Sequence, residues 1–180
     1  MEKPEENLVN AGILFMFSVW LQSQMVDLVI FSKNPSLIGD FVAHPNRVPG
    51  EFHQLRAKYW EKDFSQIKAE FLSAFASKLS GKEVDDIEHV YHLRNMIGHA
   101  HVSIARNYML FRPGGEKRER SVVDAFKPEP ITDQSDPLMF KLEFWKPDKF
   151  KAFSDLMERV DQQCFGRVAA DLGVPHGRIR

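Results

Sequence analysis

The sequence of 180 residues contains a single cysteine, Cys164. One cysteine excludes an intramolecular disulfide and is typical of proteins from reducing compartments. We expect Cys164 to be a packing residue rather than a catalytic thiol, because it lies at helical spacing from Val160 and Val168. The N-terminal residues MEKPEEN are acidic, so the sequence predicts no signal peptide and a cytoplasmic protein.

The sequence also lacks an excess of charge, since 24 Lys and Arg residues face 25 Asp and Glu residues. This balance excludes a general polyanion binder, so any contact with nucleic acid has to come from a local basic patch. Hydrophobic residues make up 43% of the chain and include 15 Phe, which excludes global disorder.

Long hydrophobic runs are absent as well. The apolar run over residues 11–21 is too short to cross a bilayer, and Gln22, Ser23, Gln24 and Asp27 interrupt its continuation. We therefore expect a buried helix there and no membrane partner.

The periodicity predicts a mainly α fold with four or five helices, in one domain over residues 1–180. Helices are expected over about 4–31, 51–79 with a break near Asp63, 84–99 and 147–172, with a loop over 35–50. A strand is expected near 121–126. Residues 108–111 form a strand or continue the third helix, and residues 138–144 form a strand or lead into the last helix. A small β-rich insertion at about 102–145 is therefore expected between the third helix and the last one.

Within the segment Leu93–His101, with the sequence LRNMIGHAH, three polar groups (Arg94, Asn95 and His99) fall within six residues of an apolar, helix-like run. Arg94 carries a permanent charge and a fork of donors that suits phosphate. His99 can give or take a proton near neutral pH. Together they suit attack by a ribose 2'-hydroxyl on the adjacent phosphorus, with His99 as general acid or base and Arg94 holding the phosphate. Asn95 would orient an oxygen or the imidazole.

Such a site needs no cofactor and no metal, because the nucleophile belongs to the substrate. On a helix, Asn95 and His99 share a face, whereas about 7.5 Å of helix rise separates Arg94 from His99. A second copy of the helix across a two-fold axis would bring two Arg and two His side chains to one cleft, so we expect a homodimer.

Simpler interpretations stay open. A helical His is often structural and an Arg is often part of a surface ion pair. His89 and His92, three residues apart, could also bind zinc with a carboxylate from elsewhere. His89 and His99 lie about 15 Å apart along a helix, too far for one ion, and the H-E-x-x-H pattern is absent.

The pattern Arg94-Asn95-x-x-x-His99 resembles the signature of the HEPN superfamily, in which an Arg, often followed by Asn, precedes a His by four to six residues. The resemblance covers about ten residues. It implies an HEPN-like helical bundle that dimerises around an RNA-cleaving cleft, with Arg94 and His99 as the catalytic pair and Asn95 as helper. It also implies toxin–antitoxin or antiviral defence systems and RNA processing as settings, and in the first an antitoxin protein as partner. His101 stands where HEPN toxins paired with a nucleotidyltransferase carry Tyr, which argues against tyrosine modification here.

A ribonuclease also has to hold the RNA backbone. Basic residues follow the motif closely and flank a Gly-Gly turn, and we expect these side chains to contact RNA. The set comprises His101, Arg106, Arg112, Lys117, Arg118 and Arg120. Alternatively, this turn is simply solvated, and the neighbouring Tyr108 and Phe111 belong to the core.

The sequence thus supports a metal-independent endoribonuclease with RNA as substrate. Two other interpretations stay open: a non-catalytic, HEPN-like dimerisation module, and a nucleotide-binding helical sensor.

Overall fold

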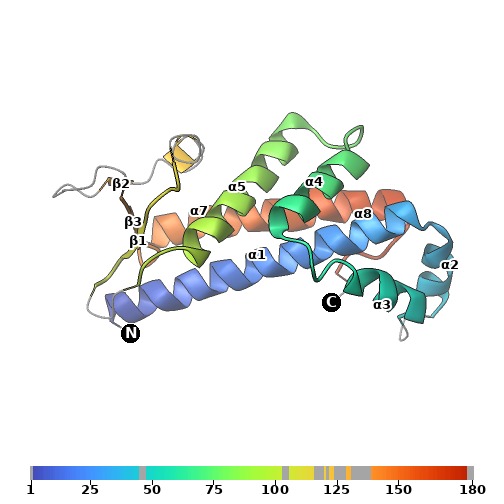
Figure 1. The fold of residues 1–180 in the computed structure, drawn as a ribbon, viewed down its shortest axis with the longest axis horizontal. Helices are drawn as coiled ribbons and strands as arrows, with labels where there is room; N and C mark the ends of the chain where they lie inside the picture. Colours follow the sequence, from blue (N-terminus) through green and yellow to red (C-terminus); the bar gives the residue numbers. More distant parts are fainter. Residues whose placement is uncertain are drawn as a thin grey trace. The chain divides into compact units, whose positions relative to one another are not determined.

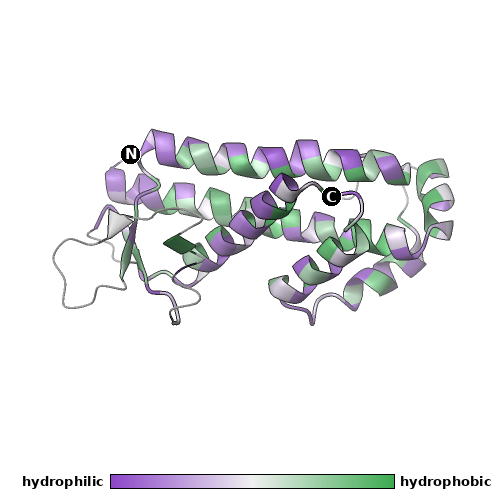
Figure 2. Cartoon of the chain, turned by 90° about the horizontal axis from the view of Figure 1, so that it is seen from above, coloured by the Kyte–Doolittle hydropathy of each residue, from purple (hydrophilic) through white to green (hydrophobic). Residues whose placement is uncertain are grey.

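The computed structural model describes residues 2–44, 48–102, 106–115, 120, 122–123, 129–130 and 139–177. The elements in chain order are α1 (Lys3–Lys33), α2 (Ser36–Ala43), α3 (Gly50–Ala57), α4 (Phe64–Ala74), α5 (Gly81–Gly98), β1 (Met109–Phe111), β2 (Glu129–Pro130), β3 (Phe140–Leu142), α7 (Pro147–Glu158), the π-helix η1 (Arg159–Phe165) and α8 (Gly166–Leu172) (Figure 1). The mainly α prediction is confirmed. The helices carry hydrophobic residues on part of their surface and hydrophilic residues on the rest (Figure 2).

The chain forms two compact units, each from two segments. The first unit comprises Met1–Ser18 and Glu88–Met157, and the second comprises Val19–Ile87 and Glu158–Arg180. The single domain over residues 1–180 stays a prediction.

The first unit contains the small sheet. β3 pairs antiparallel with both β1 and β2, in the order β1-β3-β2, and Met109 lies opposite Leu142. In both β1 and β3 the outer residues are buried and the middle residue is half-buried, which matches the two-residue period of a strand. The strand predicted over 121–126 lies mostly outside the described residues. Its described members, Val122 and Val123, have helical backbone, so the prediction is wrong for them.

Two asparagines of α1 hold the end of the sheet in this unit. The buried Asn7 accepts a hydrogen bond from the backbone N–H of Trp145 at 3.2 Å and donates to the carbonyl of Leu142 at 3.4 Å. Asn10 donates to the carbonyl of Phe144 at 2.8 Å. These bonds satisfy backbone groups where β3 ends and before α7 begins.

The second unit has an aromatic core. The Phe31 ring lies 5.0 Å from that of Phe41 and 4.9 Å from that of Phe52, which joins α1, α2 and α3. Phe71 of α4 lies 5.1 Å from Phe165 of η1. Such ring pairs add about 0.5–1.5 kcal/mol to the free energy gained by burial.

The predicted break near Asp63 is confirmed, and its cause is a capping box. The Asp63 carboxylate accepts from the N–H of Gln66 at 2.9 Å, and the Gln66 side chain accepts from the N–H of Asp63 at 3.0 Å. This pair satisfies two backbone donors at the start of α4, so a new helix begins there.

The loop predicted over 35–50 is wrong in its first half, because α2 occupies Ser36–Ala43. Leu37 and Phe41, four residues apart, are buried on one side of this short helix, and burial of these two side chains stabilises it. The last predicted helix has its expected ends but contains η1 in the middle. Gly173 ends it with a φ of 75° in the left-handed region.

By length and composition, α1 is the one helix of the described chain that could cross a membrane, although 56% of its apolar window is buried inside the protein. The core helix of a soluble protein and an N-terminal signal sequence meet the same criteria. The helix expected over about 4–31 is confirmed, since α1 covers Lys3–Lys33.

Candidate active site at the end of helix α5

The predicted motif lies at the C-terminal end of α5, in the first unit. α5 ends at Gly98, and the N–H of His99 still bonds to the carbonyl of Asn95 at 3.0 Å. A Cβ atom on Gly98 would lie 3.4 Å from Cε2 of Phe15, so the missing side chain lets this helix end approach α1 closely. His99 follows the last helical residue directly, and its side chain is exposed.

Arg94 is held from two sides. Its guanidinium carbon lies 5.5 Å from the centre of the Phe15 ring, and its Nη1 donates to Oδ1 of Asn95 at 3.2 Å. Its Nε is buried, and no acceptor among the described residues bonds to it. A guanidinium fixed by a ring and an amide, with donors to spare, is pre-organised to bind an anion such as a phosphate oxygen.

The side chain of Asn95 contacts Arg94, whereas the sequence suggested that it orients an oxygen or the imidazole. Its side-chain oxygen accepts from Arg94, so Asn95 orients the guanidinium. His99 follows Asn95 by four residues, about one helical turn. The motif thus presents an anchored cation and an exposed, titratable ring at one helix end.

The chain after the motif returns at once to the sheet. His101 forms an antiparallel bridge with Leu110 of β1, through backbone hydrogen bonds of 2.6 and 2.9 Å, and its side chain is exposed. Since β1 pairs with β3, this bridge ties the end of the motif to the sheet.

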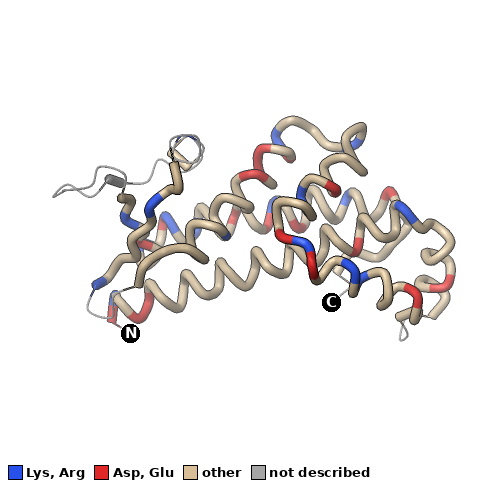
Figure 3. Tube along the Cα trace, in the orientation of Figure 1, with Lys and Arg blue, Asp and Glu red and all other residues tan. Residues whose placement is uncertain are grey.

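Two cations flank one aromatic ring near β1. The guanidinium carbon of Arg106 lies 5.6 Å from the Tyr108 ring centre, and Nζ of Lys141 on β3 lies 4.6 Å from it. Tyr108 is half-buried, which differs from a fully buried core residue. The charges of this region are drawn in Figure 3. The two cations concentrate positive charge beside β1, which suits contact with a phosphate.

The other predicted RNA-binding residues are only partly described. Arg112, directly after β1, is exposed, and so is Arg120. Lys117 and Arg118 lie outside the described residues.

No cluster of ligands among the described residues supports the zinc interpretation. Among the described residues, no group of three or more His, Cys, Asp and Glu side chains is placed to hold a metal ion, and this includes the surroundings of His89 and His92. Cys164 is buried, and burial raises the pKa of its thiol to about 12, so it is not a ready nucleophile.

One face of α1 in the same unit is apolar and exposed. Val9, Ile13 and Met16, spaced four and three residues apart, are 46%, 50% and 64% exposed. Gly12, on this face, borders open space. We call Val9, Gly12, Ile13 and Met16 the α1 stripe. Phe15, whose ring contacts Arg94, belongs to the same helix, and its position is about 100° round the helix from Met16.

Sequence reasoning missed Phe15 and Lys141, which contact Arg94 and Tyr108. Both contacts join residues far apart in the chain, and neither residue type is unusual in its own segment, so the sequence contained no signal for them.

Comparison of the chain with protein-family models, with curated proteins and with solved structures gives no significant match.

Proposed function

We propose that this protein is a metal-independent endoribonuclease with a composite active site formed by Arg94 and His99 of two copies. The observation that carries the proposal is the anchored guanidinium of Arg94, over Phe15 and beside Asn95, at the same helix end as the exposed His99. The resemblance of the motif to HEPN ribonucleases is consistent with this chemistry.

The proposed reaction is an internal transesterification. One imidazole takes the proton of the ribose 2'-hydroxyl while the 2'-oxygen bonds to phosphorus. The bond from phosphorus to the 5'-oxygen breaks, and a second, protonated imidazole gives its proton to that leaving oxygen. Arg94 stabilises the negative charge that grows on the phosphate. The products are a 2',3'-cyclic phosphate and a 5'-hydroxyl.

Because one chain has one His99, the base and the acid come from two copies. The α1 stripe supports such a dimer, because an exposed apolar face on the helix that contacts Arg94 would be buried by a second copy of itself. The basic residues near β1, among them Arg106 and Lys141 at the Tyr108 ring, would contact the RNA backbone. A cytoplasmic location and an antitoxin protein as a further partner belong to the same proposal.

The direct test is to incubate the purified protein with mixed RNA in the presence of EDTA. We expect cleavage at internal positions that EDTA does not reduce. Absence of cleavage, or its loss on chelation, would contradict the proposal.

The dimer can be tested at the α1 stripe. We expect Ile13→Glu to convert a dimer to a monomer in sedimentation velocity and to abolish RNA cleavage, because a buried pair of carboxylates would disrupt an apolar contact. Ile13 is half exposed, so the change does not threaten the fold.

The matched control is Val42→Glu, at a residue of α2 that is 45% exposed. This variant should stay dimeric and active. A wild-type protein that sediments as a monomer, or an Ile13→Glu variant that stays dimeric, would contradict the assignment of this face.

The α1 stripe also favours a second candidate, a dimerisation module without catalysis. That function predicts the same effect of Ile13→Glu on association, together with no RNA cleavage by the wild type.

A further inference from the structure

The second unit contains a cavity of about 440 Å³ that has no part in the proposed ribonuclease site. Its lining residues come from α1, α3, the turn after α3 and the start of α4, and they include His53, Arg56, Tyr59, Trp60 and Lys62. The volume lies within the range of about 300–1,000 Å³ that is usual for small-molecule sites. The lining therefore combines cationic side chains with aromatic rings.

Arg56 of this cavity forms an ion pair with a buried carboxylate. Its Nε lies 3.2 Å from Oδ1 of Asp27, whose side chain is fully buried in α1. Among the described residues, Asp27 is the ion-pair partner of Arg56, and the contact uses Nε, which leaves both Nη groups for a ligand. Burial raises the pKa of Asp27 to about 7, so near neutral pH its charge only partly balances that of Arg56.

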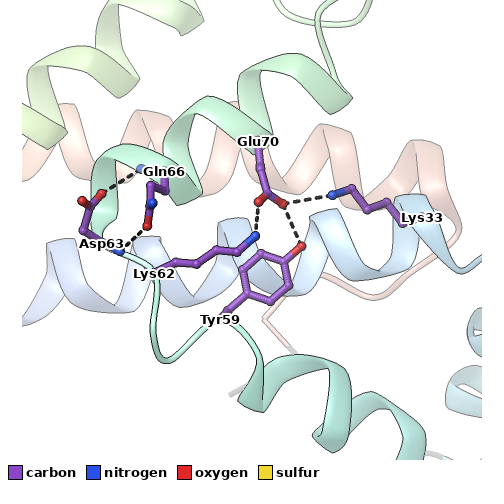
Figure 4. Close-up of polar contacts among 6 residues, drawn as sticks. All are labelled: Lys33, Tyr59, Lys62, Asp63, Gln66 and Glu70. Atoms are coloured by element: carbon purple, nitrogen blue, oxygen red, sulfur yellow. Dashed lines mark hydrogen bonds and ion pairs between the residues drawn. The ribbon is translucent and has the colours of Figure 1, made fainter.

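Lys62 is positioned in a similar way, by Glu70 of α4. The Glu70 carboxylate accepts from Lys62, from Lys33 at 2.9 Å and from the hydroxyl of Tyr59 at 2.9 Å (Figure 4). These donors, Lys62 first, lower the pKa of Glu70 to about 2, so the carboxylate stays ionised. Two lysines on one carboxylate leave an excess of positive charge on this side of the cavity, which favours an anion.

Trp60 adds an exposed aromatic surface to the cavity. Its side chain lines the cavity and is 83% exposed, although a large ring is normally buried. An exposed indole beside fixed cations matches a ligand with a planar ring next to an anionic group. Tyr59 cannot play this part, since Lys62 lies over its ring, 4.4 Å from the centre.

We propose that this cavity binds a nucleoside monophosphate, with the phosphate at Arg56 and Lys62 and the base stacked on Trp60. The fork of Arg56 suits phosphate oxygens, and stacking of a base on an indole is tolerant of base identity. The residues of this site belong to the second unit, whereas Arg94 and His99 belong to the first.

The test is isothermal titration calorimetry of the full chain with AMP, adenosine and inorganic phosphate as separate ligands. We expect saturable binding of AMP, with adenosine and phosphate each at least tenfold weaker, because each offers only half of the contacts. Trp60→Ala should weaken AMP at least about fivefold, the loss of one stacked base. Since Trp60 is exposed, this variant keeps the fold. Arg56→Gln should weaken AMP about tenfold.

Two controls locate the binding. Lys58→Gln removes a charge from the same turn at an exposed residue that does not line the cavity, and it should leave AMP affinity within twofold. Arg94→Ala should also leave AMP affinity unchanged, which separates this site from the motif. No binding of AMP at millimolar concentration, equal affinity for phosphate alone, or AMP affinity that survives both Trp60→Ala and Arg56→Gln would overturn the proposal. So would binding that depends on Arg94.

Discussion

His99→Ala is expected to slow RNA cleavage by about 100-fold or more, because a positioned acid or base contributes about 10²–10⁴ to the rate of proton-transfer reactions. Both copies carry the substitution, so the proposed composite site loses its base and its acid together. The circular dichroism spectrum and the free energy of unfolding should stay as in the wild type, since the His99 side chain is exposed. The measurement is single-turnover cleavage of a labelled RNA in EDTA.

His44→Ala is the matched control, because His44 is also exposed and its ion-pair partner among the described residues is Asp40, at 2.9 Å and four residues away. It should cleave at the wild-type rate. Equal activity of wild type and His99→Ala would remove His99 from the mechanism and contradict the proposed function.

Asn95 should act through Arg94, because its side chain bonds to the guanidinium. Asn95→Ala is therefore expected to cost less activity than Arg94→Ala, and the double variant should be no slower than Arg94→Ala alone. Additive losses would instead mean that Asn95 contacts the substrate itself.

Asp27→Asn is expected to stabilise the protein at pH 8 by up to about 4 kcal/mol and to change little at pH 4. Burial raises the pKa of Asp27 from 3.8 to about 7, against the opposing charge of Arg56. Between these values the folded chain holds a proton that the unfolded chain has lost, so the free energy of unfolding falls as the pH rises. Above pH 7 Asp27 is ionised in both the folded and the unfolded chain, so its effect on the free energy of unfolding no longer changes with pH. The measurement is urea unfolding at pH 4, 6 and 8.

The difference between wild type and Asp27→Asn isolates this one group, because all other titrations are common to both proteins. A wild type that gains stability over Asp27→Asn between pH 4 and pH 8 would show that Arg56 outweighs the cost of burial.

The sequence predicted those elements whose signals are local. The bounds of α1 follow from Pro4 at its start and Asn34-Pro35 after its end, and the break before α4 follows from Asp63. Gly173 likewise marked the end of the last helix. The motif was visible because Arg94, Asn95 and His99 are polar residues in an apolar helical run.

What the sequence could not supply depends on contacts between distant segments. The Phe31–Phe41–Phe52 cluster stabilises the short α2, but none of its members marks a helix on its own. The contact of Arg94 with Phe15 and the ion pair of Asp27 with Arg56 likewise join different helices. Periodicity predicts which residues are buried, whereas the identity of their partners comes only from the packed chain.

The most direct test of the ribonuclease site is the chemistry of the RNA ends. A defined RNA is cleaved in EDTA, and the fragments are identified by mass spectrometry. A matched RNA with one 2'-deoxynucleotide at the cleaved position serves as the second substrate. An Arg94–His99 site that uses the substrate's own hydroxyl predicts 2',3'-cyclic phosphate and 5'-hydroxyl ends, and no cleavage at the deoxy position. Fragments with 5'-phosphate ends, or cleavage of the deoxy substrate at the same position, would contradict it.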